Sequence, residues 1–133
     1  MPKMMIFEDV SQYDFDKSVE VFETSVAEHG WEIPKIHDLQ KTMAKFDKQV
    51  RPVKVIELCH PDHAGKILLE SEERIVSSLM PCRVAIYEKA DSKTYISRMN
   101  SGMMAAMMGG LIAEVMADAS SENEVILQPL LTK

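Results

Sequence analysis

The clearest hydrophobic pattern is a helical stripe near the N-terminus. Asp14 has the side chain of an N-cap residue, and Gly30 is a helix stop signal. Between them, apolar side chains recur three or four positions apart, at Phe15, Val19, Phe22 and Val26. This spacing places them on one face of an α-helix. The pattern therefore predicts a helix between Asp14 and Gly30 with one buried face.

Alternating, β-branched runs predict the strands. They lie at residues 3–8, 31–36, 53–59, 82–88 and 94–98. A turn at 90–92 joins the last two into a hairpin. Because one hairpin is explicit and helices separate the other strands, we expect an α+β fold. Its sheet is mostly antiparallel, with helices packed on one face.

Further helices follow from caps and periodicity. Asp38 caps a short helix with apolar positions Leu39, Met43 and Phe46, and Pro61 begins a helix over 61–70. A second short helix over 72–79 should turn Ile75, Val76 and Leu79 inward and end before Pro81. The strongest C-terminal helix is expected over 101–118. The apolar tail over 125–131 is expected to pack, and no linker divides the chain, so residues 1–133 form a single domain.

Strand alternation assigns side chains to the two faces of the sheet. Ile56 and Leu58 should face the helices together with Val84 and Ile86. The opposite face then carries Glu57, Arg83 and Tyr87. On a concave face, Arg83 could bind an anionic ligand. The same alternation places Cys59 and Cys82 on opposite faces.

The predicted 101–118 helix is unusual because its first three turns carry no polar face. Small residues gather on one side, and large apolar residues gather on the other. The helix belongs to a methionine-rich stretch, since six of the eleven methionines are Met99, Met103, Met104, Met107, Met108 and Met116. A helix that is apolar all round is normally buried, which favours a homodimer in this small chain. The expected interface residues are Met103, Met104, Met107, Met108 and Leu111.

Two other functions remain open for these methionines. Thioether sulfur is a soft ligand for Cu(I), and Met99, Met103 and Met107 are spaced four apart, as are Met104 and Met108. The alternative is an adaptable surface for a hydrophobic ligand or a membrane. A membrane-surface helix should carry a Lys/Arg face, which this helix lacks.

Composition and charge indicate a globular protein and argue against some functions. With 46% hydrophobic and 27% charged residues the chain is globular, and its net charge of −6 argues against nucleic-acid binding. The first residues lack the apolar run of a secretory signal, and no segment reaches the length of a spanning helix. We therefore expect a cytoplasmic protein without stable membrane insertion, whose two cysteines are reduced thiols.

The richest chemistry lies at the predicted junction between strand 53–59 and the helix that follows. Cys59, His60 and His63 cluster there, and Cys82 begins a later strand. Sulfur and nitrogen ligands of this kind suit a soft metal, with Cys82 as a fourth ligand. A thiol before a helix N-terminus is also activated, so a redox pair of Cys59 and Cys82 is the second hypothesis.

These residues carry a family resemblance. The segments 55–61 and 79–88, with their Cys-x-Pro and Pro-Cys-Arg motifs, resemble the domain-of-unknown-function 302 family. The segment 99–103 and the residues around Gly109-Gly110 resemble a Met-rich branch of it. The resemblance covers most of residues 13–118. It implies an α+β fold similar to one half of the TATA-binding protein, and dimerisation. It implies no biochemical role.

Nothing in the sequence matches a hydrolase triad, a phosphate loop or a nucleotide fingerprint. We therefore predict a small dimeric binding or accessory module rather than an enzyme, with no catalytic residue and no cofactor assigned. A small ligand or soft metal would lie near Cys59, His60, Cys82, Arg83, Glu57 and Tyr87, with Cys59, His60 and His63 as the metal ligands. A thiol-redox or sulfur-handling enzyme using Cys59 or Cys82, and a purely structural protein, are the alternatives.

Overall fold

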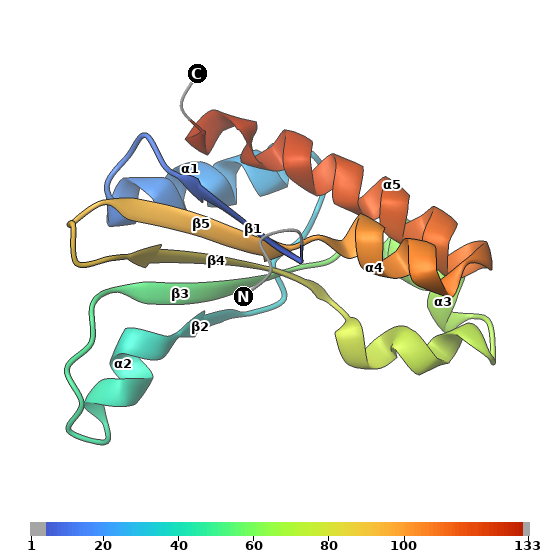
Figure 1. Ribbon diagram of the computed structural model, residues 1–133, viewed down its shortest axis with the longest axis horizontal. Helices are drawn as coiled ribbons and strands as arrows, with labels where there is room; N and C mark the ends of the chain where they lie inside the picture. Colours follow the sequence, from blue (N-terminus) through green and yellow to red (C-terminus); the bar gives the residue numbers. More distant parts are fainter. Residues whose placement is uncertain (1–4, 132–133) are drawn as a thin grey trace.

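The computed structural model describes residues 5–131 and contains one five-stranded antiparallel sheet (Figure 1). The strand order is β1-β5-β4-β3-β2. The strands are β1 (Ile6–Val10), β2 (Ile36–Asp38), β3 (Val53–Leu58), β4 (Cys82–Glu88) and β5 (Thr94–Met99). The helices are α1 (Phe15–Glu28), α2 (Leu39–Ala44), α3 (Pro61–Leu68), the 3-10 helix η1 (Glu73–Leu79), α4 (Ser101–Met108), α5 (Gly110–Leu127) and the 3-10 helix η2 (Gln128–Leu130). The predicted α+β class and antiparallel sheet are confirmed.

The core lies between one face of the sheet and the helices α1 and α5, which run together across it (Figure 1). Ile56, Leu58, Val84 and Ile86 point into this core, as strand alternation predicts. Their partners are Phe15, Val19, Phe22, Val26, Trp31, Ile96, Ala119, Ile126, Leu127 and Leu130. The C-terminal tail therefore packs, as expected.

The predicted caps explain where the early helices begin and end. The Asp14 carboxylate accepts a hydrogen bond from the Lys17 backbone N at 2.9 Å, and Asp38 caps α2 through Lys41 N at 3.0 Å. Gly30, at a φ of +76°, ends α1 in the left-handed region that favours glycine. These local signals confirm the predicted starts of α1 and α2.

The C-terminal helix differs from its prediction. Instead of one helix over 101–118, the chain forms α4 and α5 with a break at Gly109-Gly110. Both glycines have a positive φ, +69° and +58°, which interrupts helical geometry. The small and large faces expected for one continuous helix therefore do not run across the break. Helix α5 also extends nine residues beyond position 118, to Leu127.

Two shorter segments also differ. Within 31–36 only Ile36 enters a strand, because Glu32 forms just an isolated bridge to Cys59 and Trp31 is buried in the core. In η1, Val76 is buried, but Ile75 is 77% exposed and Leu79 is 39% exposed, so only one of the three side chains predicted to point inward is buried. The three-residue period of a 3-10 helix turns Ile75 away from the face of Val76, and Leu79 lies at the exposed end of the helix.

At the N-terminus, residues 3 and 4 of the predicted first strand lie outside the described residues. So does the start of the segment on which the expectation about a secretory signal rests. Among residues 5–131, no helix is long and apolar enough to cross a membrane.

Candidate ligand-binding site

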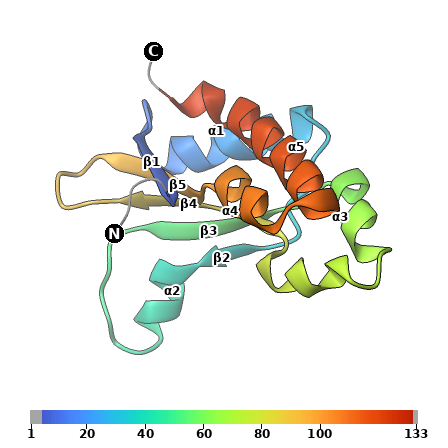
Figure 2. The same cartoon turned by 45° about the vertical axis from the view of Figure 1, so that its right-hand side comes forward.

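The predicted Cys/His corner lies at the end of the sheet, where β3 leads into α3. Figure 2 shows α3 and η1 beyond the ends of the strands, with α3 beside α5. Pro61 occupies the first turn of α3, and His60 is its N-cap. The His60 Nδ1 atom accepts a hydrogen bond from the Asp62 backbone N at 3.2 Å. His60 therefore stabilises the start of the helix that carries His63.

Helix α5 supplies a carboxylate that ties this corner together. Glu122 Oε1 accepts a hydrogen bond from Trp31 Nε1 at 3.0 Å, and Glu122 Oε2 lies 2.6 Å from His63 Nε2. Burial raises the pKa of Glu122, but the hydrogen bonds from Trp31 and His63 outweigh it and hold the pKa below its ordinary 4.5. The carboxylate is therefore ionised at neutral pH, so His63 Nε2 carries the proton in this pair.

This pair predicts an acid-sensitive contribution to stability. Because the folded pKa of Glu122 is depressed, its contribution is complete above the unfolded value near pH 4.5 and lost as pH falls through the folded pKa. We expect Glu122→Gln to be less stable than the wild type at pH 7. The difference in urea midpoint should shrink steadily below pH 4.5. A constant difference between pH 7 and pH 3 would contradict this assignment.

Three aromatic rings form one wall of the corner. The Trp31 ring centre lies 5.5 Å from that of His60 and 5.7 Å from that of His63, and the two imidazoles are 5.1 Å apart. With Nε2 engaged by Glu122, the other ring nitrogen of His63 is unsatisfied: His63 Nδ1 is buried and has no hydrogen-bond partner. Buried polar atoms without partners are rare in native proteins.

These rings line a cavity of about 400 Å³, here called the corner cavity. Its lining is mostly apolar and includes Trp31, Pro34, Leu58, Ala64, Ile67, Leu68, Leu79, Met80, Pro81, Val115, Met116 and Ala119. Its wall also carries side chains with charged, imidazole, hydroxyl or thiol groups: Glu57, Cys59, His60, His63, Ser77 and Cys82. A mostly apolar cavity of this size with a few polar groups is typical of small-molecule sites.

Both cysteines line the corner cavity, although alternation placed them on opposite faces. Strand β3 ends at Leu58, which pairs with Cys82, so Cys59 lies beyond the ladder and bridges Glu32 instead. Burial raises the pKa of the Cys82 thiol, and a hydrogen bond from Asn123 only partly offsets this effect. Cys82 is therefore a protonated thiol at neutral pH.

The two thiols should consequently differ in reactivity. We expect iodoacetamide at pH 7.5 to modify Cys59 before Cys82, because the thiolate is the nucleophile and burial disfavours it at Cys82. Mass spectrometry of the native protein after short exposure measures the two sites separately, and each single Cys→Ser variant checks the assignment. Equal rates, or faster modification of Cys82, would contradict the prediction.

The remaining predicted ligand residues are distributed around the sheet. Glu57 and Arg83 are direct cross-strand partners, as the alternation predicts, but Glu57 Oε2 instead contacts His37 Nε2 at 2.9 Å. Arg83 is exposed and lines a second cavity. Tyr87 lines neither cavity, and its hydroxyl donates a hydrogen bond to Glu8. Burial, followed by that hydrogen bond, raises the pKa of Tyr87 to about 12.

The structure shows no assembled ligand set, within the residues it describes, for the soft metal proposed at the Cys/His corner. Within residues 5–131, no group of three or more His, Cys, Asp or Glu side chains is arranged to hold a metal ion. His60 Nδ1 caps α3, and His63 Nε2 contacts Glu122. Of the methionines considered for copper, Met99, Met104 and Met108 line the second cavity, whereas Met107 is 85% exposed.

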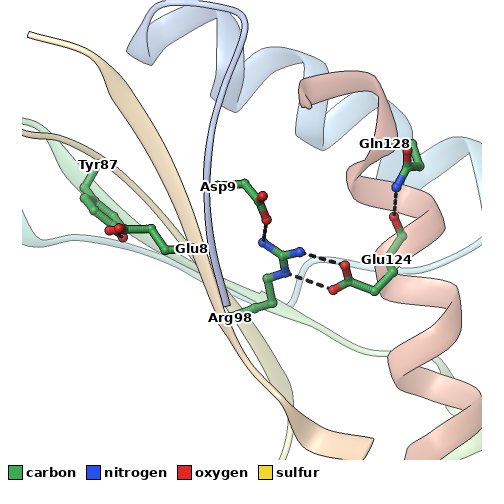
Figure 3. A network of polar contacts seen from close by, with 6 residues as sticks. All are labelled: Glu8, Asp9, Tyr87, Arg98, Glu124 and Gln128. Atoms are coloured by element: carbon green, nitrogen blue, oxygen red, sulfur yellow. Dashed lines mark hydrogen bonds and ion pairs between the residues drawn. The ribbon is translucent and has the colours of Figure 1, made fainter. Parts of the chain in front are cut away.

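A polar network fixes α5 against the strands beside these cavities (Figure 3). Arg98 on β5 donates from Nε and Nη2 to the two carboxylate oxygens of Glu124, at 2.9 and 2.7 Å. Its Nη1 donates to Asp9 Oδ2 on β1 at 2.7 Å. In Figure 3, Tyr87 and Glu8 lie on the other side of β5 from this network. Arg98 thus joins β1, β5 and α5.

Sequence reasoning missed four residues of this region: Trp31, Glu122, Asn123 and Arg98. The sequence pattern predicts a strand at Trp31, and both α5 residues lie beyond the predicted helix end at 118. Their partners are distant in sequence, so no spacing rule connects them. The only available signal was the apolar tail over 125–131, which indicated that the chain continues to pack after residue 118.

The fold and the corner cavity together describe the class of this protein. It is a small α+β domain whose antiparallel sheet has a mostly apolar cavity at one end. A family model described as Domain of unknown function DUF302 matches residues 7–128, and the chain belongs to this family. It is also similar to the crystal structure of an uncharacterized conserved protein DUF302 from Bacillus stearothermophilus. The TM-score is 0.84 at 19% sequence identity, covering 96% of this chain and 98% of that chain.

At this identity the structural likeness bears on the fold alone. Comparison with curated proteins finds no match. The predicted family and fold class are therefore confirmed, while membership of a Met-rich branch stays a prediction.

Proposed function

We propose that this protein is a binding module that holds a small, mostly apolar molecule in the corner cavity. The observation that carries the proposal is the unpartnered, buried Nδ1 atom of His63, a residue that lines a cavity of about 400 Å³. A ligand with one hydrogen-bonding group would satisfy that nitrogen after a small side-chain adjustment, while its apolar part is removed from water.

The side chains that line the corner cavity favour ligand binding over a thiol-redox reaction. Burial raises the pKa of Cys82 and disfavours its thiolate, and His63 is engaged by Glu122. In the redox alternative, Cys59 would therefore have to be the nucleophilic thiol, because burial disfavours the thiolate of Cys82. Arg83, which could bind an anion on a concave face, lies outside the corner cavity, so the proposed ligand is not an anion.

The test is a titration with N-phenyl-1-naphthylamine, an uncharged fluorescent molecule with an apolar body and one N–H group. We expect saturable fluorescence enhancement at one probe per chain. Ala64 lines the cavity, so Ala64→Phe fills part of its volume and should weaken binding at least tenfold. The matched control is Ala117→Phe, at an exposed position of α5 that lines neither cavity. Absence of saturable binding, or unchanged binding by Ala64→Phe, would refute the proposal.

We also propose that a second copy of the chain covers α4. This helix has no charged residue, and its Met107 and Met108 side chains are 85% and 51% exposed. Contact with an identical uncharged helix would bury these methionines without desolvating a charge. Met103, Met104 and Leu111 are the other interface residues predicted from the sequence.

Light scattering tests the dimer directly. At micromolar concentration we expect a particle of twice the 15.0 kDa chain mass. Met107→Glu should shift it toward the monomer, because the change places like charges opposite each other in a two-fold contact. Ile75→Glu is the control, since Ile75 is a similarly exposed apolar residue on η1, at 77% against 85% for Met107. A monomeric wild type would exclude this proposal.

A further inference from the structure

A second cavity of about 300 Å³ is built partly from the sheet face that points away from the core. Val55, Ala85 and Ser97 are cross-strand neighbours on β3, β4 and β5, and all three line this cavity. They alternate along their strands with core residues such as Ile56, so their side chains lie on the opposite face. Because Ala85 and Ser97 are small, they leave room for a bound molecule on this part of the sheet.

Helices α4 and α5 supply much of the apolar wall of the second cavity. Met104 and Met108 come from α4, and Ile112 and Met116 come from α5. Methionine side chains are flexible and polarisable, so they can adapt their shape to an alkyl chain. This part of the cavity therefore favours an apolar group.

The second cavity also has a positive charge without a partner, at Arg83. The other charged residues that line it, Arg98 and Glu124, bind each other through two hydrogen bonds. Within the part of the chain that the structure describes, the Arg83 side chain makes no hydrogen bond or ion pair. Its cross-strand neighbour Glu57, which could neutralise it, contacts His37 instead. A chain with a net charge of −6 thus carries an unpaired guanidinium beside a mostly apolar space.

The position of Arg83 suits the charged end of an amphipathic molecule. Arg83 is exposed to solvent and also lines the cavity, so it lies at the cavity mouth. Its planar guanidinium can donate two parallel hydrogen bonds to a carboxylate. A carboxylate at the mouth keeps part of its hydration, which limits the cost of desolvation. The apolar part of the same molecule can extend toward Met104 and Met116 and leave water.

We propose that the second cavity binds an amphipathic monocarboxylate, with its carboxylate on Arg83 and its alkyl chain among the methionines of α4 and α5. One guanidinium balances one carboxylate, whereas a phosphate monoester carries nearly two negative charges at neutral pH. A single free arginine therefore favours the carboxylate. This site goes beyond the proposed function, because it lies in a different cavity and takes an anion.

Isothermal titration calorimetry with sodium octanoate at pH 7 tests the role of the charge. We expect saturable binding of one octanoate per chain. Arg83→Met keeps much of the apolar stem but removes the guanidinium, so it should weaken binding at least tenfold. Arg74→Met is the matched control and should stay within twofold of the wild type, because Arg74 is exposed on η1 and lines neither cavity. No saturable binding, or equal affinities of Arg83→Met and the wild type, would overturn the inference.

A shorter anion tests the role of the alkyl chain. Hexanoate has the same carboxylate as octanoate and two fewer CH₂ groups. Its affinity should fall by about fourfold for each CH₂ removed, because each is buried in the cavity. Equal affinities for hexanoate and octanoate would show that the site recognises only the negative charge, which contradicts the proposed class of ligand.

A pair of cavity-filling variants separates the two cavities. Leu79, Pro81, Cys82 and Met116 line both of them, so the variants are placed at residues that line only one. Ala85→Phe fills part of the second cavity and should weaken octanoate binding at least tenfold, while N-phenyl-1-naphthylamine binding stays within twofold. Ala64→Phe in the corner cavity should give the opposite pattern. If Ala85→Phe does not fold, Arg83→Met and Ala64→Phe decide the question.

The two proposals fail differently. If N-phenyl-1-naphthylamine binds and octanoate does not, the proposed function stands and the carboxylate site is excluded. If octanoate binds but only Ala64→Phe weakens it, the anion occupies the corner cavity, and the inference is wrong. If octanoate binds with the expected loss in Arg83→Met while the uncharged probe does not bind, the carboxylate site stands and the proposed function is excluded.

Discussion

Phe22→Ala should lower the free energy of unfolding by about 4 kcal/mol, the largest single effect expected for this chain. Phe22 lies on α1 and is fully buried between the sheet and the C-terminal segment. Removing its ring loses the burial of the aromatic atoms and leaves a cavity that the surrounding side chains fill only in part. A domain of this size has a total stability of about 5–15 kcal/mol, so the variant should be close to unfolded at 37 °C.

Urea denaturation followed by circular dichroism measures this loss as a lower midpoint. Phe46→Ala is the matched control, because Phe46 is 66% exposed and its removal should change stability by less than about 0.5 kcal/mol. Phe22→Leu should fall between them, since leucine keeps most of the apolar volume. If Phe22→Ala and Phe46→Ala lower the free energy of unfolding equally, Phe22 is not part of the buried core.

Arg98→Met should cost about 3 kcal/mol, the second largest expected effect. The Arg98 side chain is 8% exposed and makes three hydrogen bonds to two carboxylates, as Figure 3 shows. Methionine retains much of the apolar stem but leaves Asp9 and Glu124 without their counter-charge. Both carboxylates are partly exposed, and water therefore compensates part of the loss. This places the cost at the lower end of the range for buried pairs.

The chain offers a matched control for this charge loss. Arg51 contacts Glu88 at 2.8 Å, but its side chain is 49% exposed. Arg51→Met should therefore cost less than about 1 kcal/mol. In a double-mutant cycle, Arg98→Met and Glu124→Gln should be less costly together than the sum of the single changes. Strict additivity would show that the two side chains do not interact in solution.

The elements that sequence reasoning predicted well depend on interactions within a few residues. The Asp14 cap requires only the backbone N of Lys17, and the placement of Ile56 and Leu58 follows from strand alternation. The two segments that carry the family resemblance, 55–61 and 79–88, are also short continuous runs of sequence. Such signals are readable because both partners occupy one turn or one strand.

The candidate site was predicted only in part. The sequence identified Cys59, His60 and His63 as neighbours, and the structure places them with Cys82 around one cavity. It grouped Tyr87 with them, although Tyr87 belongs to a different polar cluster with Glu8. The error arises because a shared sheet face extends over many residues, whereas a site occupies only one end of it.

By itself, the sequence determined the α+β class, the main strands, the caps of α1 and α2 and the residues of the core face. The tertiary structure alone decided that the methionine helix breaks at Gly109-Gly110 and that Glu122 meets both Trp31 and His63. Those partners lie 91 and 59 positions from Glu122, so no local period relates them. The cavities likewise lie between segments that are distant in sequence. They exist because the packed side chains leave part of the space between these segments unfilled. The eleven methionines could be counted in the sequence, but only the packing shows which of them line a cavity and which are exposed, and Met108 is both.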